Sequence, residues 1–213
     1  MIKVETNCGG RMPDSWMRNA HAMGIKYIAP NFSLEDATYE GVMRLKEQAA
    51  RFDLEISNAG CPRLQKCAEI HLAKPDRDEW INRYNDFTKA LGKAGIPINF
   101  VAWQPNGIQR TKTDIGKYNR GMKSFICDME EIKNRPIAND RVYGEEEIWA
   151  NFKYFIDRAL PVCEEAGVKL ALHPNDPPVA DLCGVHSLIY RSLDYDRAFA
   201  LAGESPFLTM KMC

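Results

Sequence analysis

Two residues that could bind a metal ion follow apolar segments of the chain. His173 comes directly after Lys169-Leu170-Ala171-Leu172, and Cys213 comes shortly after Phe207-Leu208-Thr209-Met210. Neutral imidazole and thiolate are good ligands for a divalent transition-metal ion. If both apolar runs are neighbouring strands of a parallel sheet, the two side chains lie at the same edge of it and form part of one site. Taken singly, each residue also has a plainer interpretation, as a hydrogen-bonded core histidine and as a small buried thiol.

A rigid polar turn follows His173. Asn175 and Asp176 have one proline before them and two prolines after them. Because proline fixes the backbone angle φ, these prolines hold the two polar side chains in place above the strand end. We predict that Asn175 and Asp176 contact a polyol substrate. A turn with no ligand remains the alternative.

A second candidate binding segment is Trp-Gln-Pro-Asn-Gly-Ile-Gln-Arg-Thr, which covers residues 103–111. Arg110 could bind a substrate carboxylate through both arms of its guanidinium group. Asn106 stands on the same segment and could help to orient that ligand. Asn106-Gly107 is also a common turn dipeptide, so an ordinary turn remains the alternative.

The other histidines give weaker signals. His21, His71 and His186 have no metal-ligand spacing with one another, and we expect His21 and His71 at the surface or in loops. Phosphate-binding and serine-nucleophile motifs of the usual patterns are absent from the sequence. No residue stands out as a general acid or general base.

The elements that would position these residues repeat along the chain. Three helix-like stretches end in a glycine that is followed by a β-branched residue and an apolar run, at Gly24, Gly95 and Gly167. Glycine just past a helix end adopts the left-handed conformation without strain. Apolar strands that alternate with helices indicate parallel α/β architecture. We predict six strands, at about 2–6, 26–30, 54–58, 97–102, 168–173 and 207–212, and a long helix from about Glu145 to Ala166.

Residues 103–144 break this rhythm. The stretch is polar, contains several glycines and prolines, and is much longer than a usual strand-to-helix loop. It follows the fourth strand, so in a (β/α)8 TIM barrel it would be an insertion on the C-terminal face, where active sites are built. We predict one domain over residues 1–213. Because a barrel needs eight units and this sequence stops on the sixth strand, with an open edge, we expect a piece of a longer barrel.

Composition excludes several classes of partner. The net charge is −1 and 45% of the residues are hydrophobic, so we expect no nucleic acid and no membrane as a partner. The seven cysteines are scattered and form no Cys-x-x-Cys pair. We interpret them as reduced thiols of a cytoplasmic protein.

These residues resemble one known family, the mannonate dehydratases, whose fold is a xylose-isomerase-like TIM barrel. The most specific match is Leu170-Ala171-Leu172-His173-Pro174-x-Asp176-Pro177-Pro178. Weaker matches are Asn7-Cys8-Gly9-Gly10, Arg77-Asp78, the segment Trp103-x-Pro105-Asn106-Gly107 with Arg110-Thr111, and Tyr190-Arg191-Ser192. The resemblance extends along the whole chain.

The resemblance implies a function and a cofactor. It implies a lyase that removes water from a sugar acid, D-mannonate, to give 2-keto-3-deoxy-D-gluconate. It also implies a divalent ion, usually Mn²⁺ with Fe²⁺ or Co²⁺ as alternatives, bound by His173, Cys213 and two further ligands that have no counterpart here. The family usually has Asp where this chain has Asn175. A small-molecule sugar acid is then the partner, and we expect the full-length protein to be a homo-oligomer.

Two other functions stay open. The first is a sugar isomerase or epimerase of the xylose-isomerase type, in which carboxylates and histidines are the usual metal ligands. The second is a catalytically inactive barrel that binds sugar acids. The change to Asn175 favours the inactive barrel, whereas a cysteine ligand favours the dehydratase.

Overall fold

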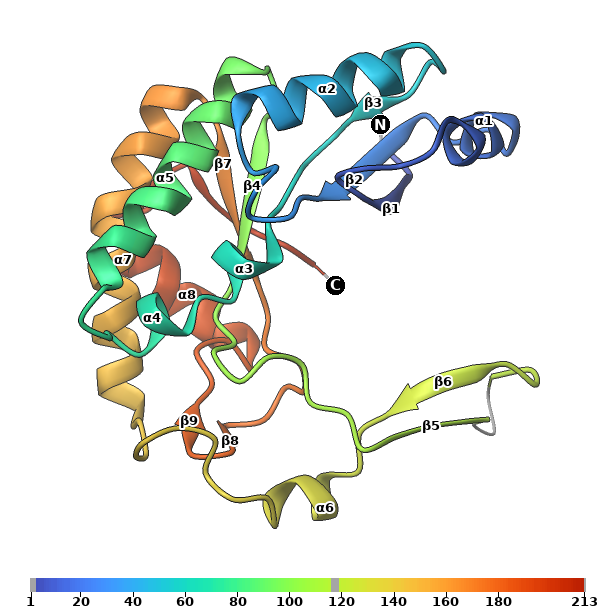
Figure 1. Cartoon of the computed structure of the whole chain (residues 1–213). Helices are drawn as coiled ribbons and strands as arrows, with labels where there is room; N and C mark the ends of the chain where they lie inside the picture. The colour runs from blue at the N-terminus through green and yellow to red at the C-terminus, as the bar shows by residue number, and fades with distance from the viewer. Residues whose placement is uncertain (1–2, 116–118, 213) are drawn as a thin grey trace.

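Six parallel strands form two three-stranded sheets, each backed by helices (Figure 1). The computed structural model describes residues 3–115 and 119–212. One sheet has the strand order β1-β2-β3 and the other has the order β10-β7-β4. The strands are β1 (Glu5–Gly9), β2 (Tyr27–Asn31), β3 (Glu55–Ile56), β4 (Ile98–Ala102), β7 (Lys169–His173) and β10 (Leu208–Met210). The predicted parallel α/β architecture is confirmed.

The two sheets meet between β3 and β4. β3 is only two residues long, and the regular ladder stops after it. Just beyond β3, the Ala59 N–H donates to the Ile98 carbonyl at 3.0 Å. This backbone hydrogen bond links the first sheet to β4 of the second. We expected a strand over 54–58. In the structure β3 ends at Ile56, before the polar residues Ser57 and Asn58.

The first strand lies further along the chain than predicted. It starts at Glu5 and extends to Gly9, where Gly9 pairs with Asn31 of β2. Its second half, Asn7-Cys8-Gly9, is polar or small and does not have the apolar pattern of a buried strand. Pairing with β2 overrides this weak local preference, as strand propensity depends strongly on context.

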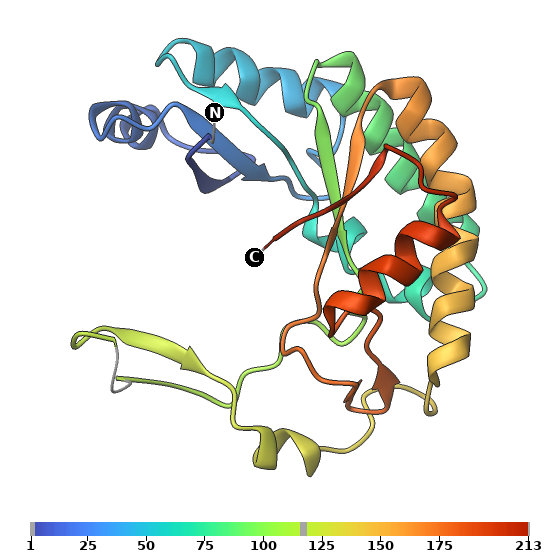
Figure 2. The ribbon, with the colours of Figure 1, turned by 180° about the vertical axis from the view of Figure 1, so that it is seen from behind.

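Helices cover the outer face of both sheets (Figures 1 and 2). The two longest, α5 and α7, lie side by side behind β4 and β7 in both views. The helices are α1 (Asp14–Ala22), α2 (Tyr39–Ala50), α3 (Pro62–Gln65), α4 (Ala68–His71), α5 (Arg77–Lys93), α6 (Met129–Lys133), α7 (Glu145–Ala166) and α8 (Ser192–Leu201).

Helix α7 matches the prediction from its sequence at both ends. Its buried face carries Trp149, Phe152, Ile156, Ala159 and Cys163, which follow the helical spacing. Gly167 ends the helix with a φ of 66°, a left-handed conformation that suits glycine. The chain then passes directly into β7, so α7 fixes the start of the strand that carries His173.

Two small hairpins extend the loops at the carboxyl ends of the strands. In the first, β5 (Lys112–Ile115) pairs antiparallel with β6 (Lys123–Ile126), and it projects from the body as an arm (Figure 2). In the second, β8 (Asp181–Leu182) pairs with β9 (Val185–His186). The sequence did not predict either hairpin, because the first is polar and the second has only two residues in each strand.

Two further observations concern the cysteines and the helices of the described residues. Six cysteines are placed by the structure, Cys8, Cys61, Cys67, Cys127, Cys163 and Cys183, and all six are free thiols. Among the described residues, no helix has the length and apolar character needed to cross a membrane.

Candidate metal and substrate site

His173 stands at the end of β7, beside Ala102 of β4, and is half-buried. Its Nδ1 lies 2.6 Å from the carbonyl oxygen of Pro174. A carbonyl can only accept, so Nδ1 carries the proton and the lone pair is left on Nε2. Burial is the main factor that lowers the pKa of His173 below its ordinary value, which favours the neutral ring. Histidines that bind metal ions have this arrangement, with one nitrogen held by a backbone carbonyl and the other available.

Cys213, the predicted second metal ligand, lies outside the described residues. The register of the strands shows what lies level with His173 instead. Met210 pairs with Leu172, and the next residue, Lys211, donates its backbone N–H to the Leu172 carbonyl at 2.9 Å. The strand position beside His173 is therefore occupied by Lys211. Its Nζ lies 3.5 Å from the centre of the Phe100 ring.

The part of the chain that the structure describes contains no group of three or more His, Cys, Asp or Glu side chains that could hold a metal ion. His173 is thus the one predicted ligand whose geometry is visible. Binding of a metal ion by His173 and Cys213 stays a prediction.

Arg110 and Asp176, two predicted substrate-binding residues, lie together and bind each other. Arg110 Nη2 is 2.7 Å from Asp176 Oδ2, and Nη1 is 3.2 Å from Oδ1. The same Nη1 also donates to the Gln109 carbonyl at 2.7 Å. The hydrogen bond to Asp176 is the main factor that raises the pKa of Arg110. The guanidinium fork that we expected to receive a substrate carboxylate is already paired, and direct binding of substrate by Arg110 stays a prediction.

Asn175 is buried, with 8% of its surface exposed, and both ends of its amide bind backbone groups. Nδ2 donates to the Trp103 carbonyl at 3.1 Å, and Oδ1 accepts from the Ile189 N–H at 2.9 Å. The side chain thus links the turn after β7 to the exit of β4. It needs a donor on one side, which an ionised Asp cannot supply. This requirement explains asparagine here, whereas its contact with substrate stays a prediction.

Asn106 has a similar position within the long loop. Its Nδ2 donates to the Leu182 carbonyl at 2.9 Å, and its Oδ1 accepts from Asn139 at 2.7 Å. Asn106 therefore joins the loop after β4 to the hairpin β8–β9 and to the segment after α6. The structure brings together the segments that carry the four predicted substrate-binding residues, and it uses Asn106 and Asn175 as connections between loops.

His71 is not at the surface, and our expectation for it was wrong. The ring is fully buried and stacks on Trp103, with ring centres 4.1 Å apart. Burial lowers the pKa of His71 to about 3. Its position at the end of α4, one residue after the buried Ile70, was the available signal. The other expected surface histidine, His21, is exposed as predicted.

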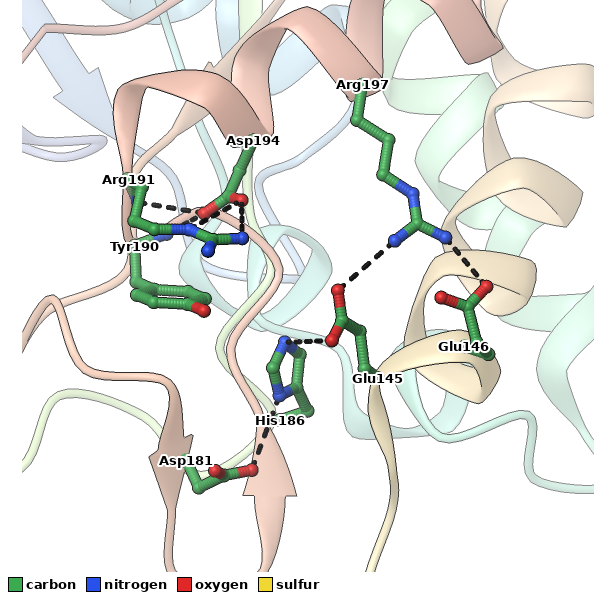
Figure 3. A network of polar contacts seen from close by, with 8 residues as sticks. All are labelled: Glu145, Glu146, Asp181, His186, Tyr190, Arg191, Asp194 and Arg197. Carbon is green, nitrogen blue, oxygen red and sulfur yellow. Dashed lines mark hydrogen bonds and ion pairs between the residues drawn. The ribbon is translucent and has the colours of Figure 1, made fainter.

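Sequence reasoning also missed His186, which joins three elements (Figure 3). Nδ1 lies 3.3 Å from Asp181 Oδ1, and Nε2 lies 4.0 Å from Glu145 Oε2. Arg197 of α8 binds both Glu145 and Glu146 at the start of α7. The two carboxylates face opposite nitrogens of the ring, so they cannot share one metal ion with it. The network instead fixes the hairpin β8–β9 against α7 and α8.

The chain matches known proteins in sequence and in structure. A family model described as D-mannonate dehydratase (UxuA) matches residues 128–213, which include the His173 turn. The mannonate dehydratase of Streptococcus pneumoniae (strain 70585) is 32% identical over 164 residues, which is 65% of this chain and 44% of that protein. The crystal structure of mannonate dehydratase from Streptococcus suis serotype 2 has a TM-score of 0.78 at 25% identity, and the match covers 94% of this chain and 61% of that one.

The chain is therefore similar to mannonate dehydratases in sequence and in structure. It spans about half the length of the curated relatives that it matches, 44% and 56% in two of them. D-psicose 3-epimerase from Clostridium cellulolyticum H10 has a TM-score of 0.64 at 13% identity, covering 98% of this chain and 62% of that protein. At this identity the likeness concerns the fold alone. Together these neighbours support an α/β TIM-barrel fold for this chain.

Proposed function

We propose that the protein is a sugar-acid dehydratase, a carbon–oxygen lyase that converts D-mannonate to 2-keto-3-deoxy-D-gluconate and water. The observation that carries the proposal is His173. It stands at the end of a barrel strand in a chain similar to mannonate dehydratases, and its Nδ1 is tied to the Pro174 carbonyl so that Nε2 can bind a ligand. Relatives named mannonate dehydratase support the reaction class.

The proposed cofactor is a divalent ion, Mn²⁺ first and Fe²⁺ or Co²⁺ as alternatives. The donor chemistry of His173 fits such an ion, because the ring is neutral and correctly hydrogen-bonded. Cys213 would be the second ligand, and the remaining ligands would lie outside this sequence. When bound, the ion would stabilise negative charge on the substrate oxygens and so acidify the proton on C2.

The reaction balances without an oxidant. The C2–H bond breaks and a base takes the proton, the electron pair forms the C2=C3 double bond, and the C3–O bond breaks as the hydroxyl leaves with a proton as water. The resulting enol becomes the 2-keto acid. In this scheme the paired Arg110 and Asp176 form a polar wall beside His173, and Asn106 and Asn175 keep the loops in register.

The proposal includes the whole molecule. We infer that this chain supplies the first six β/α units of an eight-unit barrel and that residues 103–144 form part of the wall around the site. We also expect the full-length protein to be a cytoplasmic homo-oligomer. An epimerase is not favoured by any contact in the site, since the likeness to D-psicose 3-epimerase concerns the fold alone.

The test is to incubate the full-length protein with D-mannonate and Mn²⁺ and to follow formation of the 2-keto acid. We expect product with Mn²⁺ and none after removal of metal with a chelator. The variant His173→Asn should lose activity by at least about 100-fold, because a neutral amide is a much poorer ligand for a transition-metal ion. If the protein isomerises a sugar and forms no keto acid, or if it binds mannonate without turnover, the dehydratase proposal is wrong.

A further inference from the structure

Two peptide groups, one on each side of His173, determine where its ring lies. The Leu172 carbonyl belongs to the planar peptide unit that also contains the backbone nitrogen and Cα of His173. The Pro174 carbonyl, which holds His173 Nδ1 at 2.6 Å, shares a peptide plane with the Asn175 N–H. Whatever holds these two peptide planes therefore sets the direction of His173 Nε2.

Both peptide planes are held by one segment, residues 189–195, which includes the first turn of α8. At one end of the segment, the Ile189 carbonyl accepts from the Asn175 N–H at 2.7 Å, and the Ile189 N–H donates to Asn175 Oδ1 at 2.9 Å. At the other end, Tyr195 Oη donates to the Leu172 carbonyl at 3.0 Å. The segment thus binds the chain just before and just after His173.

The segment itself is fixed by a buried carboxylate (Figure 3). Asp194 has 4% of its surface exposed, and its Oδ2 accepts from the backbone N–H groups of Tyr190 and Arg191 at 3.0 and 2.8 Å. Its Oδ1 also accepts from Arg191 Nη2 at 2.8 Å. These hydrogen bonds satisfy backbone donors at the start of α8. Tyr195, the next residue, therefore reaches the end of β7 from a fixed backbone.

The Tyr195 hydroxyl is suited to this contact. The side chain is half-buried, and its ring stacks on Phe199 one helical turn later, with ring centres 6.0 Å apart. Burial raises the pKa of Tyr195 to about 12, so the hydroxyl stays protonated and donates at neutral pH. The Leu172 carbonyl also accepts from the backbone N–H of Lys211 at 2.9 Å. The peptide before His173 is thus held both from α8 and from the strand end after β10.

We propose that Tyr195 is a positioning residue that orients His173 Nε2 for metal binding. This inference rests on the proposed function, which supplies the metal ion. Tyr195 acts through the peptide between Leu172 and His173 rather than by contact with the ion. Without the hydroxyl, one of the two hydrogen bonds to this carbonyl is lost, and the His173 ring gains freedom to tilt. A ligand with more freedom binds a metal ion more weakly, because that freedom must be lost on binding.

The test measures Mn²⁺ binding, without substrate, in the full-length protein and in two variants. Tyr195→Phe removes the hydroxyl and keeps the stacked ring. Tyr154→Phe is the matched control, because it removes a hydroxyl that donates to Asp78 at 2.8 Å between α7 and α5. Calorimetry gives the dissociation constants, and circular dichroism checks that each variant is folded. The visible spectrum of the Co²⁺-loaded protein reports the geometry of the ligands, which a loss of stability alone would not change.

We expect Tyr195→Phe to weaken Mn²⁺ binding by about tenfold, the lower end of the effect of residues that orient a metal ligand, and to shift the absorption bands of bound Co²⁺. Tyr154→Phe should match the wild type in both measurements. An unchanged dissociation constant or an unchanged Co²⁺ spectrum in folded Tyr195→Phe overturns the inference, and so does an equal loss of affinity in Tyr154→Phe.

The outcomes also separate this inference from the proposed function. If the protein binds Mn²⁺ but forms no keto acid, the dehydratase proposal fails, while a loss of Mn²⁺ affinity confined to Tyr195→Phe still supports Tyr195. A wild-type protein that binds no Mn²⁺ overturns the proposed cofactor and this inference together.

Discussion

His71 shows how a single buried residue can make the fold sensitive to acid. The ring is fully buried against Trp103, and neither of its nitrogens has a hydrogen-bond partner among the described residues. Desolvation is the main cause that lowers its pKa from 6.5 to about 3. The unfolded chain therefore takes up a proton between these values and the folded chain does not. This difference stabilises the fold above pH 6.5, and the stabilisation is lost as the pH falls towards 3.

The variant His71→Phe tests this linkage. Phenylalanine keeps the ring stack and removes the titrating group, so we expect little change in the free energy of unfolding at pH 7. Between pH 6.5 and 4.5 the variant should lose about 2 to 3 kcal/mol less stability than the wild type, at about 1.4 kcal/mol for each pH unit. Urea unfolding at several pH values measures the difference. The exposed His21 provides the control His21→Phe, which should keep the wild-type slope, and an equal slope in His71→Phe would show that His71 is not the source.

Single residues also show how far the sequence predicted the site. His173, Arg110 and Asp176 stand out because their types and their places after apolar runs or between prolines are visible in the sequence. Their roles depend on neighbours that the sequence does not reveal. Asp176 meets Arg110 from another loop, and Asn175 binds the Trp103 carbonyl at the exit of β4. Contacts of this kind form only after the elements have packed.

At the scale of elements, the contact between α5 and α7 depends on one small residue. Gly92 lies inside α5, and a Cβ on it would come within 2.4 Å of the Ala166 carbonyl oxygen and 2.9 Å of the Ala166 Cβ. Glycine normally weakens a helix interior relative to alanine. The close approach of the two helices explains why glycine is present, since there is no space for a methyl group.

We predict that Gly92→Ala destabilises the protein by about 1 to 3 kcal/mol, because the overpacked helices must separate. Helix propensity alone predicts the opposite sign, a gain of up to about 1 kcal/mol, so the sign of the change decides between the two effects. Urea unfolding measures it. Gly144→Ala is the matched control, because a Cβ at Gly144 would meet nothing within 4 Å, and its effect should stay within about 1 kcal/mol.

The elements that the sequence predicted are those with a strong local signal. The ends of α7 and the apolar strands β4 and β7 follow from helical periodicity, glycine caps and continuous apolar runs. Strand β1 was displaced and the two hairpins were missed. Their backbone conformation is set by pairing with a partner strand, and their side chains carry little apolar pattern. For residues 103–144, the sequence therefore predicted a long insertion after the fourth strand but did not predict the elements within it.

At the scale of the whole molecule, the two sheets differ in how well they are supported. The sheet β10-β7-β4 lies against the two longest helices, and Leu170 and Leu172 of β7 are completely buried. The sheet β1-β2-β3 has exposed positions along β1, a β3 of two residues, and one backbone hydrogen bond to the other sheet, from Ala59 to Ile98. The first sheet can therefore open without disrupting the second.

Amide hydrogen exchange tests this division. The Leu170 N–H donates to the Phe207 carbonyl at 2.8 Å, and the Ser57 N–H donates to the Ile28 carbonyl at 3.1 Å, so both amides belong to parallel pairing. We expect the Leu170 amide to exchange at least about tenfold more slowly, since local opening of β1-β2-β3 needs less free energy than opening of the β4–β7 pair beneath α5 and α7. Equal rates for the two amides would mean that both sheets open together as one cooperative unit. A slower Leu170 amide would mean that the sheet carrying His173 stays closed during that opening, which keeps the geometry of the candidate site independent of motion in the first sheet.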